Sequence, residues 1–343
     1  MTAVDTLLQA ETRRYRSIDL PDELLVGSID THIHSGPWLT SCPGRMDPVQ
    51  IAEAAKAAGM RGIVFYDHTL GNSAGTAWLT SRVVRDLPIY GGIILTSAQG
   101  GMNPRAVKTA LYYGAGAKFV HMGAHCTYHM ASREGALVDG VPRLFKDLYP
   151  KFTAEELSRA IRIPLEDPVP GELEEILGLV AEHPEAYLIS GHVAPEEVMR
   201  LAELVERFGI RRFIVAHPAR ALLTMAQQKD LARRGMFLEG AVSDWLFHRG
   251  LPRTNYYAEP EYADEIAGIA NAPQFAGVVP WARQMREIGL EHFVLATDYG
   301  IRSSPSPLEG MRLLISTLLD LEFTNDEIEL LVKRNPARLL GME

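Results

Sequence analysis

The chain alternates short apolar runs with longer amphipathic stretches, and this alternation limits its fold more than any other feature. Eight runs rich in Val, Ile and Phe are predicted strands, at 28–34, 62–68, 90–97, 117–122, 186–192, 212–217, 236–242 and 292–298. Helical patterns lie between most of them, which indicates βα units and a parallel sheet. Eight such units close a (β/α)8 TIM barrel, and 343 residues are enough to build one.

Helix boundaries support the same order of elements. Asp47-Pro48 and Asn103-Pro104 each offer a capping side chain followed by proline at the first helical position. Residues 195–208 begin with proline and two acids, and Gly209 is expected to end that helix. Further helices are expected at 221–234, at 308–321 and, with a bend or second turn at Asn335-Pro336, at 324–341.

The chain is predicted to form one main domain. Residues 1–27 are expected to be an N-terminal extension, and 28–343 a single barrel domain with long insertions at 123–170 and 243–276. Both insertions follow predicted strands, the fourth and the seventh, at the face that carries the active site in such barrels. They are therefore candidate lids or substrate walls, with an oligomer contact as the alternative reading.

Composition excludes several classes of function. The formal net charge of −9 argues against a nucleic-acid-binding surface, which needs a basic patch. No apolar run is long enough to span a membrane, and the first residues lack the apolar segment of a signal peptide. With two cysteines in the chain, a reducing cytoplasm is the expected location. We expect a small-molecule substrate and neither nucleic acid nor membrane as a partner.

Histidines gather at the ends of the predicted strands. His32 and His34 close the first strand, and because side chains alternate along a strand, both lie on one face. The ends of other strands carry His68, His192, His217 and Asp298. Strand ends of a barrel converge on one rim, and imidazole and carboxylate are common ligands of Zn²⁺ and related ions. The pattern predicts a metal centre.

The residues that carry this pattern resemble the amidohydrolase superfamily. The matching motifs, which span about 27–341, are Asp30-Thr31-His32-Ile33-His34, Ser190-Gly191-His192, Ala216-His217-Pro218, Ala296-Thr297-Asp298-Tyr299-Gly300 and the tail Asn335-Pro336-Ala337-Arg338-Leu339-Leu340-Gly341. The resemblance implies a metal-dependent hydrolase with one or two divalent ions, Zn²⁺ first and Mn²⁺ or Fe²⁺ as alternatives. It also implies a homo-oligomer.

The resemblance assigns ligands residue by residue. His32, His34 and Asp298 would bind the more buried ion. His192 and His217 would bind a second ion, or one of them would bind metal and the other substrate. Members with two ions bridge them with a carboxylated lysine from the fourth strand, where Lys118 is the only lysine.

Two strands leave alternatives open. Lys118 and His121 have opposite parity, so a regular strand cannot point both of them inward. If His121 faces the site, Lys118 is structural and the centre holds one ion. In the second strand His68 shares the parity of Tyr66, and it is either a substrate contact, an additional ligand or a plain rim histidine.

Chemical roles follow from this assignment. Asp298 is the expected general base and then acid, with His217 as a second candidate catalytic residue. Substrate contacts are expected from His68, Arg105, His125 and Arg302, and Glu239 is expected to be a buried hydrogen-bonding acid. The expected reaction is attack of activated water on the carbonyl of an amide, cyclic amide or lactone. A metal-dependent decarboxylase or hydro-lyase of the same superfamily is the alternative.

Overall fold

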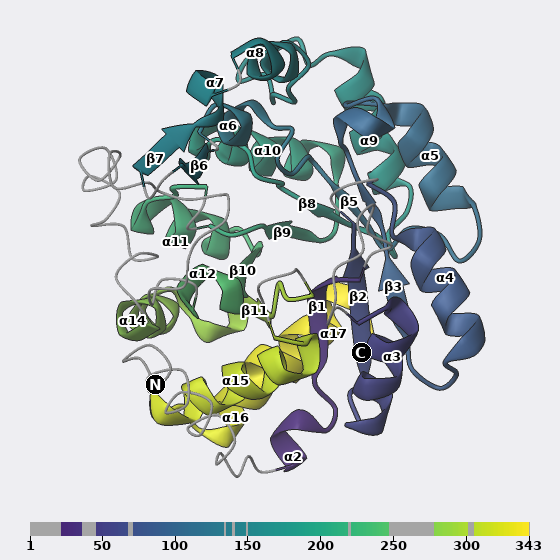
Figure 1. Ribbon diagram of the computed structural model, residues 1–343, viewed down its shortest axis with the longest axis vertical. Helices are drawn as coiled ribbons and strands as arrows, with labels where there is room; N and C mark the ends of the chain where they lie inside the picture. Colours follow the sequence, from purple (N-terminus) through teal and green to yellow (C-terminus); the bar gives the residue numbers. More distant parts are fainter. Residues whose placement is uncertain are drawn as a thin grey trace.

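Eight parallel strands form the centre of the computed structural model, which describes residues 22–35, 46–67, 71–133, 135–138, 141–148, 150–218, 221–246, 278–300 and 305–342 (Figure 1). The barrel strands are β1 (Ile29–His34), β2 (Gly62–Tyr66), β3 (Ile89–Gly91) continued by β4 (Ile93–Ile94), β5 (Phe119–His121), β8 (Tyr187–Ile189), β9 (Phe213–Val215), β10 (Phe237–Ala241) and β11 (Phe293–Ala296). All eight predicted strands are present, which confirms the predicted (β/α)8 barrel.

The sheet closes on itself at the meeting of the first and last strands. The pairing orders are β1-β2-β3 and β11-β10-β9-β8-β5-β4. Between β1 and β11, Ile33 forms a parallel bridge with Tyr299. The N–H groups of His34 and Asp298 donate to the carbonyls of Tyr299 and His32 at 2.8 and 2.9 Å. These bonds complete the ring of strands.

The third barrel strand is broken at Gly92, so the predicted strand 90–97 is shorter than expected. A side chain at Gly92 would lie 2.4 Å from the carbonyl oxygen of Phe119 on β5, which explains why glycine stands there. The hydroxyl of Ser73 accepts the N–H of Gly92 at 3.0 Å. On either side of the break, β3 pairs with β2 and β4 pairs with β5.

Helices surround the strands (Figure 1). They are α3 (Pro48–Ala57), α4 (Ala74–Val83), α5 (Pro104–Tyr112), α9 (Gly171–Ala181), α10 (Pro195–Phe208), α11 (Met225–Arg233), α14 (Val278–Ile288) and α15 (Pro307–Asp320). The predicted caps are confirmed: Asp47 accepts the N–H of Gln50 at 2.8 Å, and Asn103 accepts that of Arg105 at 3.0 Å. Gly209 ends α10 with a φ of 68°.

The last predicted helix consists of three parts. These are α16 (Asn325–Glu329), the π-helical segment η5 (Leu330–Arg334) and α17 (Asn335–Leu340). Asn335 is fully buried, and its side-chain amide donates to the carbonyls of Leu290 and Phe293. The wide π turn stands immediately before the Asn335-Pro336 step at which a bend or second turn was expected, and it lets the chain continue past a proline that has no N–H.

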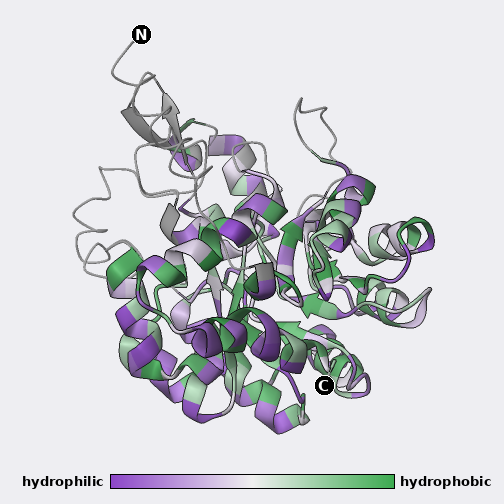
Figure 2. Cartoon of the chain, turned by 90° about the horizontal axis from the view of Figure 1, so that it is seen from below, coloured by the Kyte–Doolittle hydropathy of each residue, from purple (hydrophilic) through white to green (hydrophobic). Residues whose placement is uncertain are grey.

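Two apolar layers hold the barrel together. The inner layer includes Val64, Phe119, Tyr187 and Ile214, and Leu339 and Leu340 of α17 pack against it. The outer layer lies between strands and helices. In Figure 2 the central strands are mostly apolar, whereas the helices carry polar and apolar residues together, as expected of helices with one buried face. The apolar tail of the chain thus contributes to the barrel interior.

The insertion after the fourth barrel strand has secondary structure of its own. It contains α6 (Tyr128–Ala131), the antiparallel pair β6 (Gly135–Val138) and β7 (Val141–Leu144), α7 (Phe145–Leu148) and α8 (Pro150–Ser158). The second insertion is described only over its first residues, in α12 (Val242–Leu246). Short elements are α2 (Asp22–Leu25), η1 (Ser97–Gln99) and η4 (Leu290–His292).

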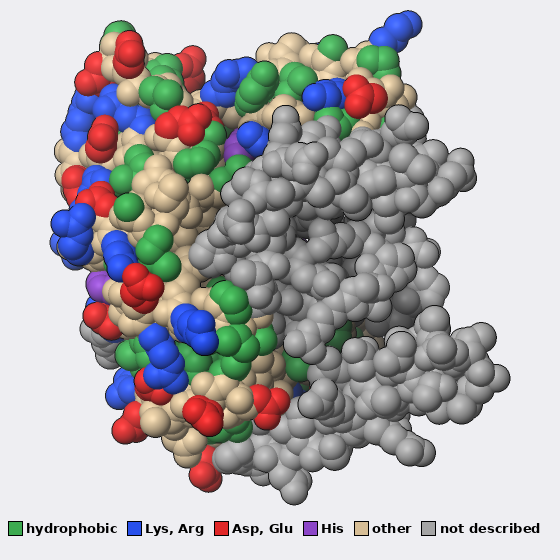
Figure 3. Space-filling model, turned by 90° about the vertical axis from the view of Figure 1, so that its left-hand side faces the viewer, with side chains coloured by type: hydrophobic (Ala, Val, Ile, Leu, Met, Phe, Trp, Pro, Cys, Tyr) green, Lys and Arg blue, Asp and Glu red, His purple; other side chains and the backbone are tan. Residues whose placement is uncertain are grey.

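The described surface shows mixed charge. On the face seen in Figure 3, basic and acidic side chains are interspersed. Among the described residues, no helix is both long and apolar enough to cross a membrane.

Candidate metal centre

The carboxyl ends of β1, β9 and β11 bring three predicted metal ligands together. One ligand atom from each of His32, His217 and Asp298 lies within 4.8 Å of the other two, and all three side chains are buried. These residues come from strands that are far apart in sequence, and the barrel makes them neighbours. Two imidazoles and a carboxylate form a donor set that fits Zn²⁺, Mn²⁺ or Fe²⁺.

His34 joins this group through Asp298. Its Nε2 lies 2.8 Å from Oδ1 of Asp298, and Nε2 of His32 lies 3.3 Å from the same oxygen. The rings of His32 and His34 are 5.1 Å apart. Both imidazoles of the His-x-His pair therefore turn Nε2 toward the same oxygen of the Asp298 carboxylate.

Glu239 fixes the orientation of the His32 ring through Nδ1, the nitrogen that does not contact Asp298. Its Oε1 lies 2.8 Å from Nδ1 of His32, and its Oε2 accepts the backbone N–H of His217 at 3.2 Å. Burial by itself lowers the pKa of His32, but the charges of Glu239 and Asp298 outweigh it and raise that pKa above its ordinary value. Burial raises the pKa of Glu239, yet His32 and His217 hold it below its usual range. Glu239 is thus the buried hydrogen-bonding acid expected from the sequence, and it directs Nε2 of His32 toward the centre.

Two neighbouring residues absent from the sequence prediction also contact the centre. Nδ1 of His217 lies 2.9 and 3.1 Å from the two carboxylate oxygens of Asp244. The hydroxyl of Ser243 donates to Oδ2 of Asp298. Both residues begin the long loop after the seventh barrel strand, and their only sequence signal is that polar residues follow a strand end.

His217 and Asp298 share an uncommon backbone conformation. Their φ angles are 41° and 54°, in the left-handed region that residues with a side chain rarely adopt. Such strain persists where surrounding contacts hold it, and it concentrates at functional sites.

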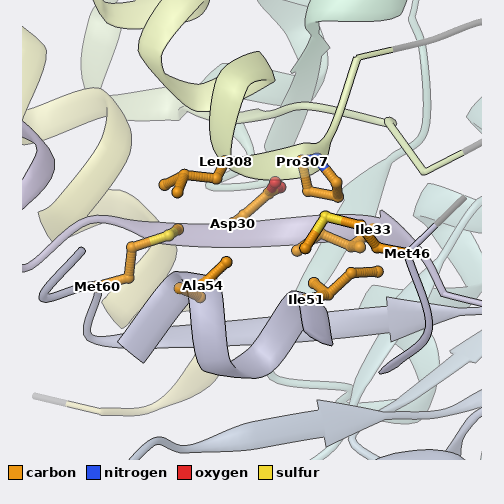
Figure 4. Close-up of a pocket in the computed structure, with 9 residues that line it drawn as sticks. Asp30, Ile33, Met46, Ile51, Ala54, Met60, Pro307 and Leu308 are labelled. Atoms are coloured by element: carbon orange, nitrogen blue, oxygen red, sulfur yellow. The ribbon is translucent and has the colours of Figure 1, made fainter. Parts of the chain in front are cut away.

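Asp30 supports the centre from the outer side of β1. It accepts hydrogen bonds from the N–H and hydroxyl of Thr297, at 3.1 and 2.6 Å, and from the N–H of His32 at 3.2 Å. Its carboxylate faces a small apolar cavity between β1, α3 and α15, lined by Met46, Ile51, Pro307 and Leu308 among others (Figure 4). Burial there raises the pKa of Asp30 to about 6. Asp30 therefore ties the backbone of His32 to the residue before Asp298.

Further histidines extend the group toward β5 and β8. The rings of His192 and His217 are 5.3 Å apart, those of His121 and His192 are 5.8 Å apart, and those of His125 and His192 are 5.6 Å apart. His121 is buried at the end of β5, where burial and the neighbouring histidines hold its pKa well below its usual value. The ring of Tyr66 stacks on His32 with 3.8 Å between centroids. The structure thus brings His192 and His125 beside the predicted metal ligands.

Lys118 lies elsewhere. It precedes β5, so it stands at the opposite end of this strand from His121, and its ammonium group lies 5.0 Å over the ring of Tyr90. Burial and the charge of Arg212 lower its pKa to about 8, partly offset by Glu185. The opposite parity of Lys118 and His121 thus resolves with His121 beside the histidines. The structure does not bring Lys118 to the centre, and a carboxylated Lys118 remains a prediction without support from this placement.

The remaining predicted substrate contacts are outside the cluster or outside the described chain. Arg105 is exposed in the first turn of α5. His68 and Arg302 lie outside the described residues.

Solved structures share this fold at low sequence identity. One is the amidohydrolase 2 from Bifidobacterium longum subsp. infantis, 13% identical, covering 92% of this chain and 99% of that one with a TM-score of 0.50. A mutant organophosphorus hydrolase from Deinococcus radiodurans is 13% identical, covering 93% and 94%, with a TM-score of 0.53. A lactonase from Listeria monocytogenes is 13% identical, covering 93% and 96%, with a TM-score of 0.52. The resemblance to the amidohydrolase superfamily is therefore confirmed at the level of the fold.

Comparison of sequences gives a family without an assigned activity. No curated protein matches the chain. A family model described as a family of unknown function (DUF6282) matches residues 27–239, which is more than half of the chain and includes β1 through most of β10. The chain thus belongs to the DUF6282 family.

Proposed function

We propose that the protein is a metal-dependent hydrolase of a small molecule with an amide, cyclic amide or lactone carbonyl. The observation that carries this proposal is the convergence of His32, His34 and His217 on the carboxylate of Asp298. The same cluster places a candidate general base among candidate ligands, at the face of the barrel where such enzymes have their active sites.

The residues of the centre would have different roles: metal binding, proton transfer and stabilisation of the oxyanion. His32, His34, His217 and Asp298 would hold a divalent ion, which when bound lowers the pKa of water and polarises a carbonyl oxygen. The Asp298 carboxylate would accept a proton from the attacking water and deliver it to the leaving group. His192, whose ring lies 5.3 Å from that of His217, would stabilise the negative charge that develops on the carbonyl oxygen.

The printed activities of the structural neighbours guide the choice of substrates. They include a lactonase and an organophosphorus hydrolase. A panel of lactones, hydantoins, cyclic imides and phosphotriesters, assayed with protein loaded with Zn²⁺, Mn²⁺ or Fe²⁺, tests the proposal. We expect turnover of at least one class that is lost on chelation and regained with metal. A protein that binds no divalent ion would contradict it.

One observation favours a second candidate, a metal-dependent decarboxylase or hydro-lyase. Lys118 lies at the far end of β5, which fits a centre with one ion and no bridging lysine. Metal content per chain, followed by incubation with aromatic acids and measurement of released CO₂, tests this alternative. One ion per chain with CO₂ release would replace the hydrolase proposal, whereas two ions would argue against the decarboxylase.

Assembly and location stay proposals. We propose a cytoplasmic homo-oligomer that has a small-molecule substrate and neither nucleic acid nor membrane as a partner. Light scattering of the purified full chain tests the oligomer.

A further inference from the structure

We propose that Ser243 and Asp244 are the positioning residues of the centre, which set the ligand atoms that Asp298 and His217 present to a metal ion. The pair is consecutive in sequence, and each member contacts a different one of the two functional residues. The inference concerns metal binding itself, so it holds for either reaction proposed above.

The pairing of the last two strands places Ser243 beside Asp298. Ala241 of β10 lies opposite Ala296 of β11, and two residues later the N–H of Ser243 donates to the carbonyl of Thr297 at 3.4 Å. The Ser243 hydroxyl donates to Oδ2 of Asp298. The other oxygen, Oδ1, is the one 2.8 Å from Nε2 of His34. Ser243 thus keeps Oδ1 turned toward the histidine pair.

Asp244 selects the nitrogen that His217 offers. An ionised carboxylate only accepts hydrogen bonds, so Nδ1 of His217, at 2.9 Å, carries the proton of this bond. In a neutral imidazole with that proton the lone pair is on Nε2, which lies 3.8 Å from Oδ2 of Asp298. A neutral imidazole binds metal through its unprotonated nitrogen. Asp244 therefore makes His217 a ligand, and the stabilisation of a developing oxyanion falls to His192.

The contacts of Ser243 and Asp244 also support an uncommon backbone conformation. His217 and Asp298 are held with φ angles of 41° and 54°, and conformations of this kind need external support. Ser243 and Asp244 are themselves buried at the start of α12. Because one short segment supports both ligands, loss of the two contacts together should be non-additive.

The first test reads the tautomer of His217 in metal-free protein. Nitrogen-15 NMR of the histidine-labelled full chain should show His217 protonated at Nδ1, and Asp244→Leu should move the proton to Nε2. Asp244→Asn, whose amide oxygen can still accept, should restore the first form at least in part. His32, held by Glu239, is the internal control and should not change. A wild-type tautomer of His217 in Asp244→Leu would overturn the proposal.

The second test measures affinity for Zn²⁺ alone, by competition with a chelator. Loss of a residue that orients a ligand costs about 10–100-fold in metal affinity. We expect a loss in this range for Asp244→Leu and for Ser243→Ala, recovery in Ser243→Thr, and a double-variant loss smaller than the product of the two. Ser316→Ala, which removes a buried hydroxyl on α15, is the matched control.

A variant that fails to fold must be distinguished from one that folds but binds Zn²⁺ weakly. Thermal unfolding of each metal-free variant identifies one that does not fold, and Ser243→Thr then still tests the role of the hydroxyl. Unchanged Zn²⁺ affinity in folded Ser243→Ala and Asp244→Leu would refute the positioning role. Because no substrate is used, that outcome would leave the hydrolase proposal standing, and a failed substrate panel would leave this inference standing.

Discussion

Nε2 of His34 lies 2.8 Å from Oδ1 of Asp298, although 264 positions separate the two residues along the chain. His34 ends β1, and Asp298 follows β11 by two residues, so the contact exists because the first and last strands are neighbours. The relationship would concentrate the proposed ligand and base functions in one carboxylate, and replacing it should have separable consequences for metal binding and turnover.

Asp298→Asn should lower turnover by about 10²–10⁴-fold, while metal supplied in excess stays bound. The amide retains an oxygen that can face the histidines, but it cannot accept the proton that general-base catalysis requires. Such catalysis contributes about 10²–10⁴-fold, so a loss of this size is expected. Metal content by mass spectrometry and rates on any substrate found in the panel measure both effects. Full activity in this variant would remove Asp298 from the mechanism.

Glu239→Gln should weaken metal binding by about 10–100-fold, because His32 loses the charged partner that orients its ring. Chelator competition with Zn²⁺ measures the change. Glu197→Gln is the control, since it alters another buried acid, one that accepts the N–H groups of Ile163 and Ala194. Equal losses in the two variants would show a general effect of removing buried charge.

His121→Leu should stabilise the fold. His121 is 1% exposed, and its Nδ1 has no hydrogen-bond partner among the described residues. An unsatisfied buried polar group costs about 1–3 kcal/mol, so the variant should unfold at a temperature several degrees higher. His183→Leu is the contrasting control, because its Nδ1 pairs with the carbonyl of Leu179 at 2.7 Å, and this variant should be less stable. A lower melting temperature for His121→Leu would indicate a partner outside the described chain.

Lys118→Met should change how stability depends on pH. The folded pKa of Lys118 is about 8, below the value near ~10.4 in an unfolded chain. Between these values the unfolded state binds more protons. The destabilisation that Lys118 causes therefore decreases, and the wild type becomes more stable, as pH rises from about 8 to about 10. Below pH 8 the Lys118 ammonium is charged in the folded state, and the full cost of burying it lowers the free energy of unfolding.

Urea unfolding at several pH values checks this sign. Lys118→Met should gain most over the wild type near neutral pH, and the gain should shrink as the solution becomes alkaline. Lys108→Met, an exposed position on α5, should show no such trend. Metal content should not change in Lys118→Met, and a loss of one ion per chain would restore the bridging-lysine assignment.

The sequence predicted what local patterns determine. Short apolar runs between helical patterns located all eight strands, and the caps at Asp47 and Asn103 are local hydrogen bonds. His32 and His34 were predictable as a pair because alternation in one strand places them on one face. These features need no knowledge of which strands are neighbours.

Contacts between residues of different strands were harder to predict from the sequence. Ser243 meets Asp298 only through the register of β10 and β11, which no pattern within either strand encodes. Parity showed that Lys118 and His121 cannot both face inward, but only the structure shows that β5 begins after Lys118 and ends at His121, beside the other histidines. The hydrogen bond between Glu239 and His32 likewise depends on barrel closure.

Because the centre lies where β1 meets β11, its candidate ligands are synthesised at very different times. His32 and His34 emerge early in synthesis, whereas Asp298 emerges only when the barrel is nearly complete. A partly made chain therefore lacks a full ligand set, and an ion would bind tightly only after the ring of strands has closed. By mass action, binding that favours the closed barrel also stabilises it. Metal supply would then influence how much of the newly made protein survives, as well as how fast it works.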